Sequence, residues 1–232
     1  MFYQSIRIQI AIITKLINNT KFKIDKGDHL LDTHTHILWN IDDGSKNQCM
    51  SLQMLEIAAR SGTKAIFATP HVIERANKPS WEEIKEKTQQ LRQLCAEAQI
   101  DIMLYPGAEV QMNWELLPEL GAAGAYCLNG GRYLLVELPA AEIPAYADEF
   151  WYELELKGIT PILAHPERYQ QLRENPDLLL LWRRRGMLMQ CNSGSFTGMF
   201  GSSVCENAKV LLANGLVDLL GSDGHRSEGR NT

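Results

Sequence analysis

Short apolar runs and longer amphipathic segments alternate along the chain from Leu31 onwards. The apolar runs are rich in branched residues and end near Gly, Pro or Asn, which predicts buried strands. These strands cover residues 31–37, 64–71, 100–109, 132–139, 158–168, 187–192 and 216–225. The amphipathic segments repeat their apolar residues at helical spacing and cover 45–60, 80–98, 144–157, 176–185 and 203–214. Ser80 with Glu83, and Ser203 with Glu206, form capping boxes that predict two of the helix starts.

This alternation gives about seven strand–helix units with no low-complexity linker between them. Strands that alternate with helices form parallel sheets. So many units in one chain favour a closed ring of strands over an open sheet. We therefore expect an α/β fold, a single-domain, distorted TIM-like (β/α)7 barrel.

Polar residues occupy the carboxyl ends of most predicted strands, which is where such barrels carry their active sites. Asp43 follows the first strand closely, and Asp32, His34 and His36 share one face of it because alternate strand residues point the same way. A single buried histidine more often satisfies a hydrogen bond than binds a metal. Six strand ends that agree indicate a shared metal site. The strand-end candidates are His34, His36, His71, Glu109, Glu137, His165, Asp223 and His225.

The candidates are imidazoles and carboxylates without a thiolate, a donor set that suits Mn²⁺, Fe²⁺ or Zn²⁺. A catalytic ion needs about three protein ligands, and this chain offers more, so we expect two or three ions bridged by a carboxylate. Such ions clamp an oxyanion and acidify water in phosphoryl transfer. Arg168 follows His165, and Arg230 follows His225, so both arginines are candidates for holding phosphate oxygens.

Composition and charge narrow the class of protein. The 232 residues carry a net charge of −5, which argues against a general nucleic-acid binder. The five cysteines are scattered and odd in number, so we expect neither a disulfide scaffold nor a zinc knuckle, and a reducing cytoplasm fits best. Residues 1–28 are an N-terminal extension of unknown role, in which Arg7 and Lys15 interrupt the apolar run, so no transmembrane segment is expected.

Other catalytic motifs are absent. No cysteine is followed six residues later by arginine, so the loop of the cysteine-dependent tyrosine phosphatases is missing. Residues 194–201, GSFTGMFG, lack the lysine of a P-loop and are interpreted as a turn that lets the backbone approach the site. No Gly-x-Ser-x-Gly elbow is present. Trp39 is placed beside the expected site mouth, where it would stack on an aromatic substrate.

Seven motifs come in an order and spacing that resemble the polymerase and histidinol phosphatase (PHP) superfamily. They are DTHTH, IDDG, ATPH, PGAE, VELP, AHPERY and SDGH. IDDG and AHPERY make the chain most similar to the bacterial tyrosine-protein phosphatases of capsule and exopolysaccharide operons, the CpsB/CapC family. The resemblance runs from about Leu31 to His225, so it covers nearly all of the expected catalytic domain, residues 29–232.

This resemblance implies a PHP barrel with a trinuclear, manganese-preferring site. It also implies that Arg168 and Arg230 hold the phosphate, and that Asp32 orients a histidine. By position, the matched ligand sets are His34, His36, Glu109 and Asp223 for one ion, Glu109, Glu137 and His165 for a second, and Asp43, His71 and His225 for the third.

The activity implied is hydrolysis of phosphotyrosine on a bacterial tyrosine kinase of polysaccharide export. We expect a hydroxide held between the ions to attack phosphorus in line while Arg168 and Arg230 neutralise the phosphate oxygens. The tyrosine leaving group has a pKa near 10, so it needs less protonation than an alkoxide would. His71 and His225 are the candidates for a general acid.

Two features depart from the family pattern. Trp39 and Asn40 stand where a proline–glycine pair is usual, and the chain stops at Thr232, so we expect a C-terminus shortened by a closing helix. Alternative functions are a PHP phosphoesterase on a small molecule, such as histidinol phosphate or a nucleotide, and a catalytically weak kinase-binding homologue. A carbon–nitrogen amidohydrolase is least favoured because no lysine ends a predicted strand.

Overall fold

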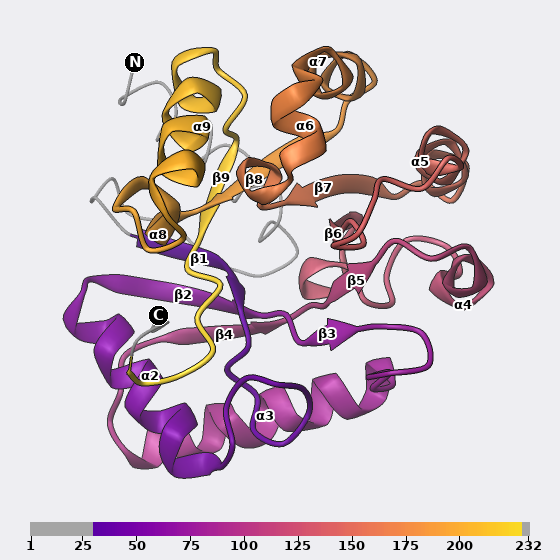
Figure 1. The fold of residues 1–232 in the computed structure, drawn as a ribbon. Helices are drawn as coiled ribbons and strands as arrows, with labels where there is room; N and C mark the ends of the chain where they lie inside the picture. The colour runs from indigo at the N-terminus through magenta and orange to yellow at the C-terminus, as the bar shows by residue number, and fades with distance from the viewer. Residues whose placement is uncertain (1–29, 229–232) are drawn as a thin grey trace.

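Parallel strands form the centre of the fold and helices cover their outer side in the computed structural model, which describes residues 30–228 (Figure 1). The strands are β1 (Leu30–Thr35), β2 (Thr63–Ala68), β3 (His71–Val72), β4 (Met103–Pro106), β5 (Glu109–Gln111), β6 (Tyr133–Glu137), β7 (Thr160–Ala164), β8 (Leu188–Asn192) and β9 (Leu219–Gly221). The helices are α2 (Gln48–Arg60), α3 (Trp81–Glu97), α4 (Leu117–Leu120), α5 (Ala147–Leu156), α6 (Gln170–Glu174), α7 (Pro176–Arg184), α8 (Ser193–Phe196) and α9 (Ser202–Ala213). Short 3₁₀ turns lie at Trp114–Leu116, Leu128–Gly130 and Pro166–Arg168.

Two of the expected strands are each broken into two pieces. The second predicted strand forms β2 and β3 with a break at Thr69 and Pro70, and the third forms β4 and β5 with a break at Gly107 and Ala108. A proline has no N–H for the ladder, which explains the first break. The backbone stays paired across it, because Gly107 N donates to Ala68 O at 2.9 Å and Glu109 N donates to Pro70 O at 3.0 Å. The breaks therefore leave seven strand positions around the centre.

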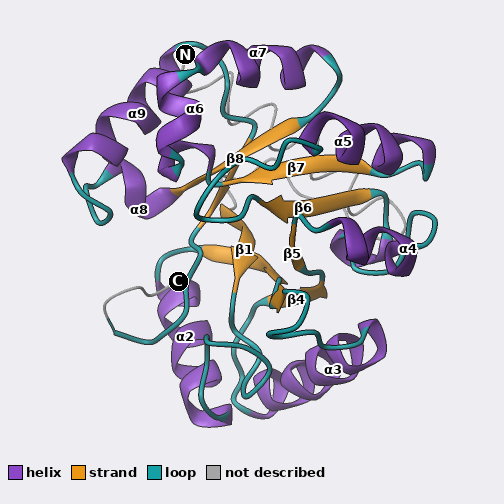
Figure 2. Ribbon diagram, turned by 45° about the vertical axis from the view of Figure 1, so that its right-hand side comes forward, coloured by secondary structure: helices purple, strands orange, loops and turns teal. Residues whose placement is uncertain are grey.

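The ring of strands closes between β1 and β9. The sheets run in the orders β1–β2–β4 and β3–β5–β6–β7–β8–β9, and neighbouring strands in each order are parallel. A parallel bridge joins Thr35 to Gly224, with His36 N donating to Gly224 O at 2.9 Å and Asp223 N donating to His34 O at 2.8 Å. The expected distorted barrel is confirmed, and Figure 2 shows its helices arranged around the central strands.

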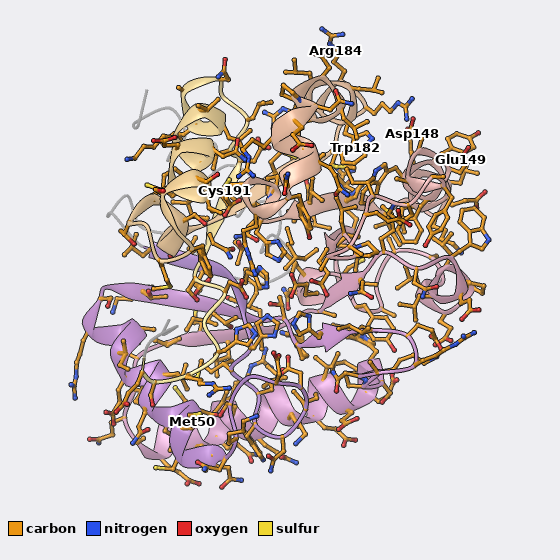
Figure 3. All side chains as sticks on the ribbon, viewed as in Figure 1. Met50, Asp148, Glu149, Trp182, Arg184 and Cys191 are labelled. Atoms are coloured by element: carbon orange, nitrogen blue, oxygen red, sulfur yellow. The ribbon has the colours of Figure 1, made fainter. Side chains whose placement is uncertain are left out.

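Apolar side chains fill the fold in two separate layers. One layer lies inside the ring of strands and includes Phe67, Tyr105 and Leu135. The other packs between the strands and the outer helices and includes Phe150, Trp151 and Trp182. On that outer side, Trp182 Nε1 donates to Asp148 Oδ1 at 2.9 Å. This hydrogen bond connects α7 to α5, and both residues are labelled in Figure 3. The inner layer leaves the carboxyl ends of the strands to polar residues.

Of the two helix starts predicted from capping boxes, one is confirmed and one is wrong. Ser80 caps α3 as expected, with its Oγ accepting a hydrogen bond from Glu83 N at 3.1 Å. The capping box at Ser203 is wrong, because α9 begins one residue earlier after Gly201 and Ser203 Oγ instead accepts from Arg173 Nη1 at 2.5 Å. The GSFTGMFG segment, residues 194–201, begins inside the short helix α8 and continues as a turn over residues 197–200.

Two predictions fall outside the described residues, namely the N-terminal extension of residues 1–28 and the phosphate-binding role of Arg230. Within residues 30–228, no helix is long and apolar enough to span a membrane.

Candidate metal centre

The carboxyl ends of the strands bring all nine predicted metal ligands to one edge of the barrel. β1 supplies His34 and, one residue beyond its end, His36, while the loop after it supplies Asp43. The other ligands come from the later strands or from the residues directly after them. The described residues contain three groups whose donor atoms lie within 4.8 Å of one another: His34, His36, Glu109 and Asp223; His71, Glu109 and Glu137; and His36, Asp43, His71 and His225.

The first group has the dimensions of a four-ligand metal site. His34 Nε2 lies 3.1 Å from His36 Nε2, 3.1 Å from Glu109 Oε2 and 3.4 Å from Asp223 Oδ1. His36 Nε2 lies 3.3 Å from each of the same two carboxylate oxygens. A tetrahedral ion with ligands at 2.0–2.1 Å separates them by ~3.3 Å. These four atoms therefore suit one ion, and they are the four that the resemblance assigned together.

The second group differs from the expected set. His71 Nδ1 lies 3.1 Å from Glu109 Oε2 and 3.2 Å from Glu137 Oε1, so His71 takes the position expected for His165. His165 is adjacent, with Nε2 2.9 Å from the other oxygen of Glu109. Glu109 thus contacts imidazoles through both of its oxygens. This geometry suits a carboxylate that bridges two ions.

The third group is the most accessible. His225 Nε2 lies 3.3 Å and His71 Nε2 lies 3.7 Å from Asp43 Oδ1. The Asp43 side chain is 67% exposed, whereas those of His34, His36 and Glu109 are at most 1% exposed. Asp43, His71 and His225 form the expected set, and His36 joins them.

Unsatisfied buried atoms show that these groups fit cations. Within residues 30–228, Oε2 of Glu109, Oε1 of Glu137 and Nδ1 of His71 are buried and form no hydrogen bond. These oxygens instead face imidazole nitrogens at ion-pair distance, and a buried carboxylate is stable only when it is paired in this way or bound to a metal. The lone pairs converge on shared points, which is the arrangement that divalent cations require. The donor set contains only nitrogen and oxygen, in keeping with Mn²⁺, Fe²⁺ or Zn²⁺.

The charges of Glu109 and His71 shift each other's pKa within the cluster. Burial opposes ionisation of Glu109, but the charges of His34 and His71 outweigh it and hold the pKa of Glu109 well below its usual range. Burial likewise lowers the pKa of His71, but the Glu109 carboxylate outweighs it and raises that pKa to about 10. The His71 imidazole is therefore protonated at neutral pH and balances part of the carboxylate charge. A divalent ion would supply the same positive charge by displacing that proton.

Two histidines are oriented by residues outside the predicted ligand set. His36 Nδ1 lies 2.7 Å from Asp42 Oδ2, and His34 Nδ1 lies 2.9 Å from Gln190 Oε1. Asp42 also accepts from the backbone N–H groups of Gly44 at 2.9 Å and His71 at 3.0 Å. The paired aspartates of the IDDG motif were the sequence signal for this role. Asp42 supports the ring of His36, whereas Asp43 belongs to the third donor group. Ring partners of this kind fix the tautomer and direction of a metal-binding imidazole.

Asp32, which was expected to orient a histidine, contacts the backbone of His34. Its Oδ1 accepts from the backbone N–H groups of Ser222 at 2.8 Å and His34 at 3.2 Å. Asp32 therefore joins the end of β9 to β1 and positions the His34 backbone rather than its ring.

Close approach to the ligand strands requires glycine at two positions. A Cβ on Gly221 would lie 2.5 Å from Cβ of His34, and a Cβ on Gly44 would collide with the backbone of His36. Two ligands also have left-handed backbones, His165 with φ 36° and Asp223 with φ 54°. Non-glycine residues in this region store strain of ~1–3 kcal/mol, which is common at functional sites. The surrounding packing therefore holds this edge in a specific shape.

Arg168 lies beside the candidate metal ligands. Its Nη1 donates to Asp223 Oδ2 at 3.0 Å, and its guanidinium carbon lies 4.9 Å from the centre of the Phe200 ring. A cavity of about 780 Å³ opens next to it and is also lined by Asp43, Glu137 and Tyr169. The arginine thus faces a space that is large enough for a phosphorylated side chain.

Trp39 does not stack at the mouth of this cavity. It is 9% exposed and belongs to the outer apolar layer, where Lys87 Nζ donates to its carbonyl oxygen at 2.9 Å and lies 5.0 Å from its ring centre. The prediction of an aromatic platform is therefore wrong, because the strand end turns this side chain towards α3. Asn40, the other unusual residue, is exposed and has φ 50°.

Comparison with known proteins places the chain in one family. Residues 30–232 match the family model for capsular polysaccharide synthesis, CpsB/CapC. The tyrosine-protein phosphatase YwqE of Bacillus subtilis is 34% identical over 202 residues, which cover 87% of this chain and 80% of YwqE. The tyrosine-protein phosphatase CpsB of Streptococcus pneumoniae is 28% identical over 206 residues, with coverage of 87% and 85%.

A solved structure agrees with these sequence matches. It comes from work on YwqE of Bacillus subtilis and CpsB of Streptococcus pneumoniae, which are described as metal-dependent tyrosine phosphatases. It is 34% identical to this chain and superposes with a TM-score of 0.81 over 87% of this chain and 82% of the other. With its barrel, its strand-end ligands and these matches, the chain belongs to the CpsB/CapC family of capsular polysaccharide synthesis.

Proposed function

We propose that this protein is a metal-dependent tyrosine-protein phosphatase. The observation that carries the proposal is the position of Arg168, which lines a cavity of about 780 Å³ together with Asp43, Glu109 and Glu137. A phosphate dianion needs positive charge from both cations and guanidinium groups, and this edge offers binding sites for both. Membership of a family whose relatives are named tyrosine phosphatases supports phosphotyrosine as the substrate.

We assign the three donor groups to three divalent ions, with Mn²⁺ preferred over Fe²⁺ or Zn²⁺. The first group would hold its ion through His34, His36, Glu109 and Asp223, and Glu109 would be shared with the second. His165 would complete the second group through its contact with Glu109 Oε1. Clustered divalent ions acidify water and neutralise the charge on the transferred phosphoryl group.

The protein residues bind and orient the phosphate ester. Arg168 has five N–H donors, and the bond to Asp223 fixes the direction of the fork. Arg230 would supply a second guanidinium, and it lies outside the described residues. A tyrosine leaving group has a pKa near 10 and leaves without strong acid assistance.

His71 and His225 fit a role in holding cations better than one in proton transfer. Both ring nitrogens of His71 face carboxylates, Nδ1 towards Glu109 and Nε2 towards Asp43. His225 Nδ1 lies 2.9 Å from the backbone oxygen of Asp223, and its Nε2 faces Asp43. Neither imidazole keeps a nitrogen for the leaving group, so the expected general-acid role is the weaker interpretation for both.

We further propose that the substrate is a phosphorylated bacterial tyrosine kinase of capsule or exopolysaccharide synthesis, and that the reaction takes place in the cytoplasm. The family description supports the link to capsular polysaccharide. All five cysteines are free thiols, as expected in a reducing compartment. No cysteine lines the described part of the cavity, so the chemistry does not use a cysteine nucleophile.

A substrate panel tests this proposal. The Mn²⁺-loaded protein is offered a phosphotyrosine peptide, a phosphoserine peptide, a nucleotide and histidinol phosphate. We expect rapid phosphate release from phosphotyrosine alone, and loss of that release in His34→Ala. Faster hydrolysis of histidinol phosphate or the nucleotide would establish the small-molecule phosphoesterase instead. Full metal content without turnover, together with binding to a kinase tail, would establish the catalytically weak homologue.

A further inference from the structure

Two buried amides on β8 connect two ligands of the first donor group. Gln190 and Asn192 are both fully buried, and they lie two residues apart, so they share the inward face of the strand. Cys191, which is labelled in Figure 3, lies between them and belongs to the outer apolar layer. Neither amide matches a metal-ligand motif in the sequence. Their hydrogen bonds nevertheless lead directly to the candidate metal centre.

The direction of each hydrogen bond follows from the chemistry of the partners. Gln190 Nε2 lies 2.7 Å from Cys191 O and 3.1 Å from Asn192 Oδ1. A carbonyl oxygen only accepts, so the amide nitrogen must face Cys191, and Oε1 must face His34 Nδ1 at 2.9 Å. His34 must then carry its hydrogen on Nδ1. Its Nε2 is left as the donor atom that faces His36, Glu109 and Asp223.

The second amide continues the chain to Asp223. Asn192 Nδ2 donates to Asp223 Oδ2 at 2.8 Å, and an opposite orientation would set two acceptors against each other. Donation therefore runs one way, from His34 through Gln190 and Asn192 to Asp223. At its far end, Asp223 Oδ1 lies 3.4 Å from His34 Nε2, so the path closes on the donor group itself. Hydrogen bonds that run in one direction strengthen one another.

Other residues hold the two amides in register. Asn192 N donates to Oε1 of Glu167, a fully buried residue of the AHPERY motif, at 2.9 Å. Gly221 on β9 leaves the necessary room, because a Cβ there would lie 2.8 Å from Gln190 Nε2. The arrangement is thus built from three neighbouring segments and does not depend on one flexible side chain.

We propose that Gln190 and Asn192 form an amide relay that positions His34 and Asp223 as one unit for cation binding. The relay fixes the His34 tautomer and the Asp223 rotamer together, so that neither ligand is set correctly without the other. It adds no charge, in contrast to Asp42, which supports His36 with a carboxylate at 2.7 Å. Gln190 and Asn192 are positioning residues, and this inference rests on the metal site assigned under the proposed function.

Zinc affinity measured by chelator competition tests the relay without any phosphatase assay. We expect Gln190→Leu and Asn192→Leu each to weaken Zn²⁺ binding ~10-fold, as loss of a partner behind a metal ligand does. The double variant is expected to lose about the same ~10-fold, because either change alone already breaks the path. Gln89→Leu on the exposed face of α3 is the matched control and keeps the wild-type affinity. Losses that multiply to ~100-fold in the double variant would overturn the relay, and so would unchanged affinity in both single variants.

Nitrogen-15 NMR of the Zn²⁺-loaded protein observes the His34 ring hydrogen directly, so it separates a loss of the relay from a general loss of stability. The Nδ1–H of His34 is expected to give a slowly exchanging ring signal that disappears in Gln190→Leu. Gln190→Glu keeps an acceptor against that hydrogen and retains the signal. Persistence of the signal in Gln190→Leu would overturn the assignment. If the zinc and NMR results are as expected but the protein does not hydrolyse phosphotyrosine, the proposed function is contradicted and the relay is still supported.

Discussion

Arg168 donates its Nη1 hydrogen to Asp223 Oδ2 over 3.0 Å, so the expected phosphate-binding arginine is attached directly to a candidate metal ligand. Asp223 is buried, whereas the Arg168 side chain is 33% exposed beside the cavity. The bond therefore sets the guanidinium at the boundary between the metal site and the space for substrate. This one contact therefore joins the expected phosphate-binding residue to the candidate metal site.

Substituting Arg168 should impair catalysis more than metal loading. We expect Arg168→Ala to lower kcat/KM for a phosphotyrosine peptide about 10²- to 10³-fold, because it removes a donor to the charged phosphoryl oxygens. Steady-state kinetics and metal analysis of the same sample give the two readings. Arg184→Ala on the exposed end of α7 is the matched control and should leave both unchanged. Equal losses of metal and activity in Arg168→Ala would show that the arginine mainly supports the metal site.

Asp42 is expected to matter as much as a direct ligand although it was not predicted as one. Asp42→Ala removes the acceptor for His36 Nδ1 and leaves two backbone N–H groups without their partner. Metal affinity should fall ~10- to 100-fold, as it does when the partner of a ligating histidine is lost. Chelator competition measures this change. Asp101→Ala, which removes an exposed carboxylate paired with Lys64, is the control, and equal affinity in the two variants would contradict the role of Asp42.

Cation binding is expected to release protons at neutral pH. The pKa of His71 is raised to about 10 without a cation, so its imidazole is protonated at pH 7.5 and must lose a proton to bind a metal. Apparent affinity should therefore rise with pH through this range. Calorimetric titration with Mn²⁺ in buffers of different ionisation enthalpy counts the protons. A binding heat that is identical in all buffers would refute the expectation, and His71→Gln should release fewer protons than the wild type.

Trp39 is expected to contribute to stability and not to substrate affinity. It packs in the outer apolar layer, so Trp39→Ala should lower the free energy of unfolding by ~3–5 kcal/mol. Urea unfolding measures the loss, and KM for a phosphotyrosine peptide should stay close to the wild-type value. Trp114→Ala is the comparison, because that side chain is 46% exposed and its removal should cost less than ~1 kcal/mol. A large change in KM with little loss of stability would restore the stacking role.

The barrel was predictable because the same short sequence pattern recurs along the chain. Each apolar run followed by an amphipathic segment gives the same parallel unit, and the strand ends then coincide in space without further assumptions. The breaks at Pro70 and Gly107 were less visible, because the residues on both sides still read as strand. A proline within an apolar run was the available signal. At Ser203 the box pattern was present, but tertiary contacts with Arg173 and the preceding Gly201 determined the helix start.

The site was predictable as a set of residues but not in its finer pairing. His71 stands with Glu109 and Glu137 in the second donor group, where His165 was expected. The reason is that β3 and β5 are direct neighbours, with His71 opposite Glu109 in the register. Gln190 and Asn192 were missed because amides lack a metal-ligand pattern and only their distances to His34 and Asp223 reveal a role. Trp39 was misplaced because sequence proximity to the ligands does not determine which way a loop residue turns.

The contrast between buried Glu109 and exposed Asp43 has a consequence for how the protein responds to metal supply. Glu109 faces imidazoles through both oxygens, so a cation that neutralises it weakens the field available to the next one. If the three donor groups bind cations as proposed, we expect the enclosed group around His34 to fill first and the exposed group around Asp43 to fill last. Asp43 is 67% exposed, so we expect ions to exchange with the surrounding solution on that side of the site. Under the proposed assignment, the concentration of free divalent metal would then decide what fraction of the molecules holds every ion.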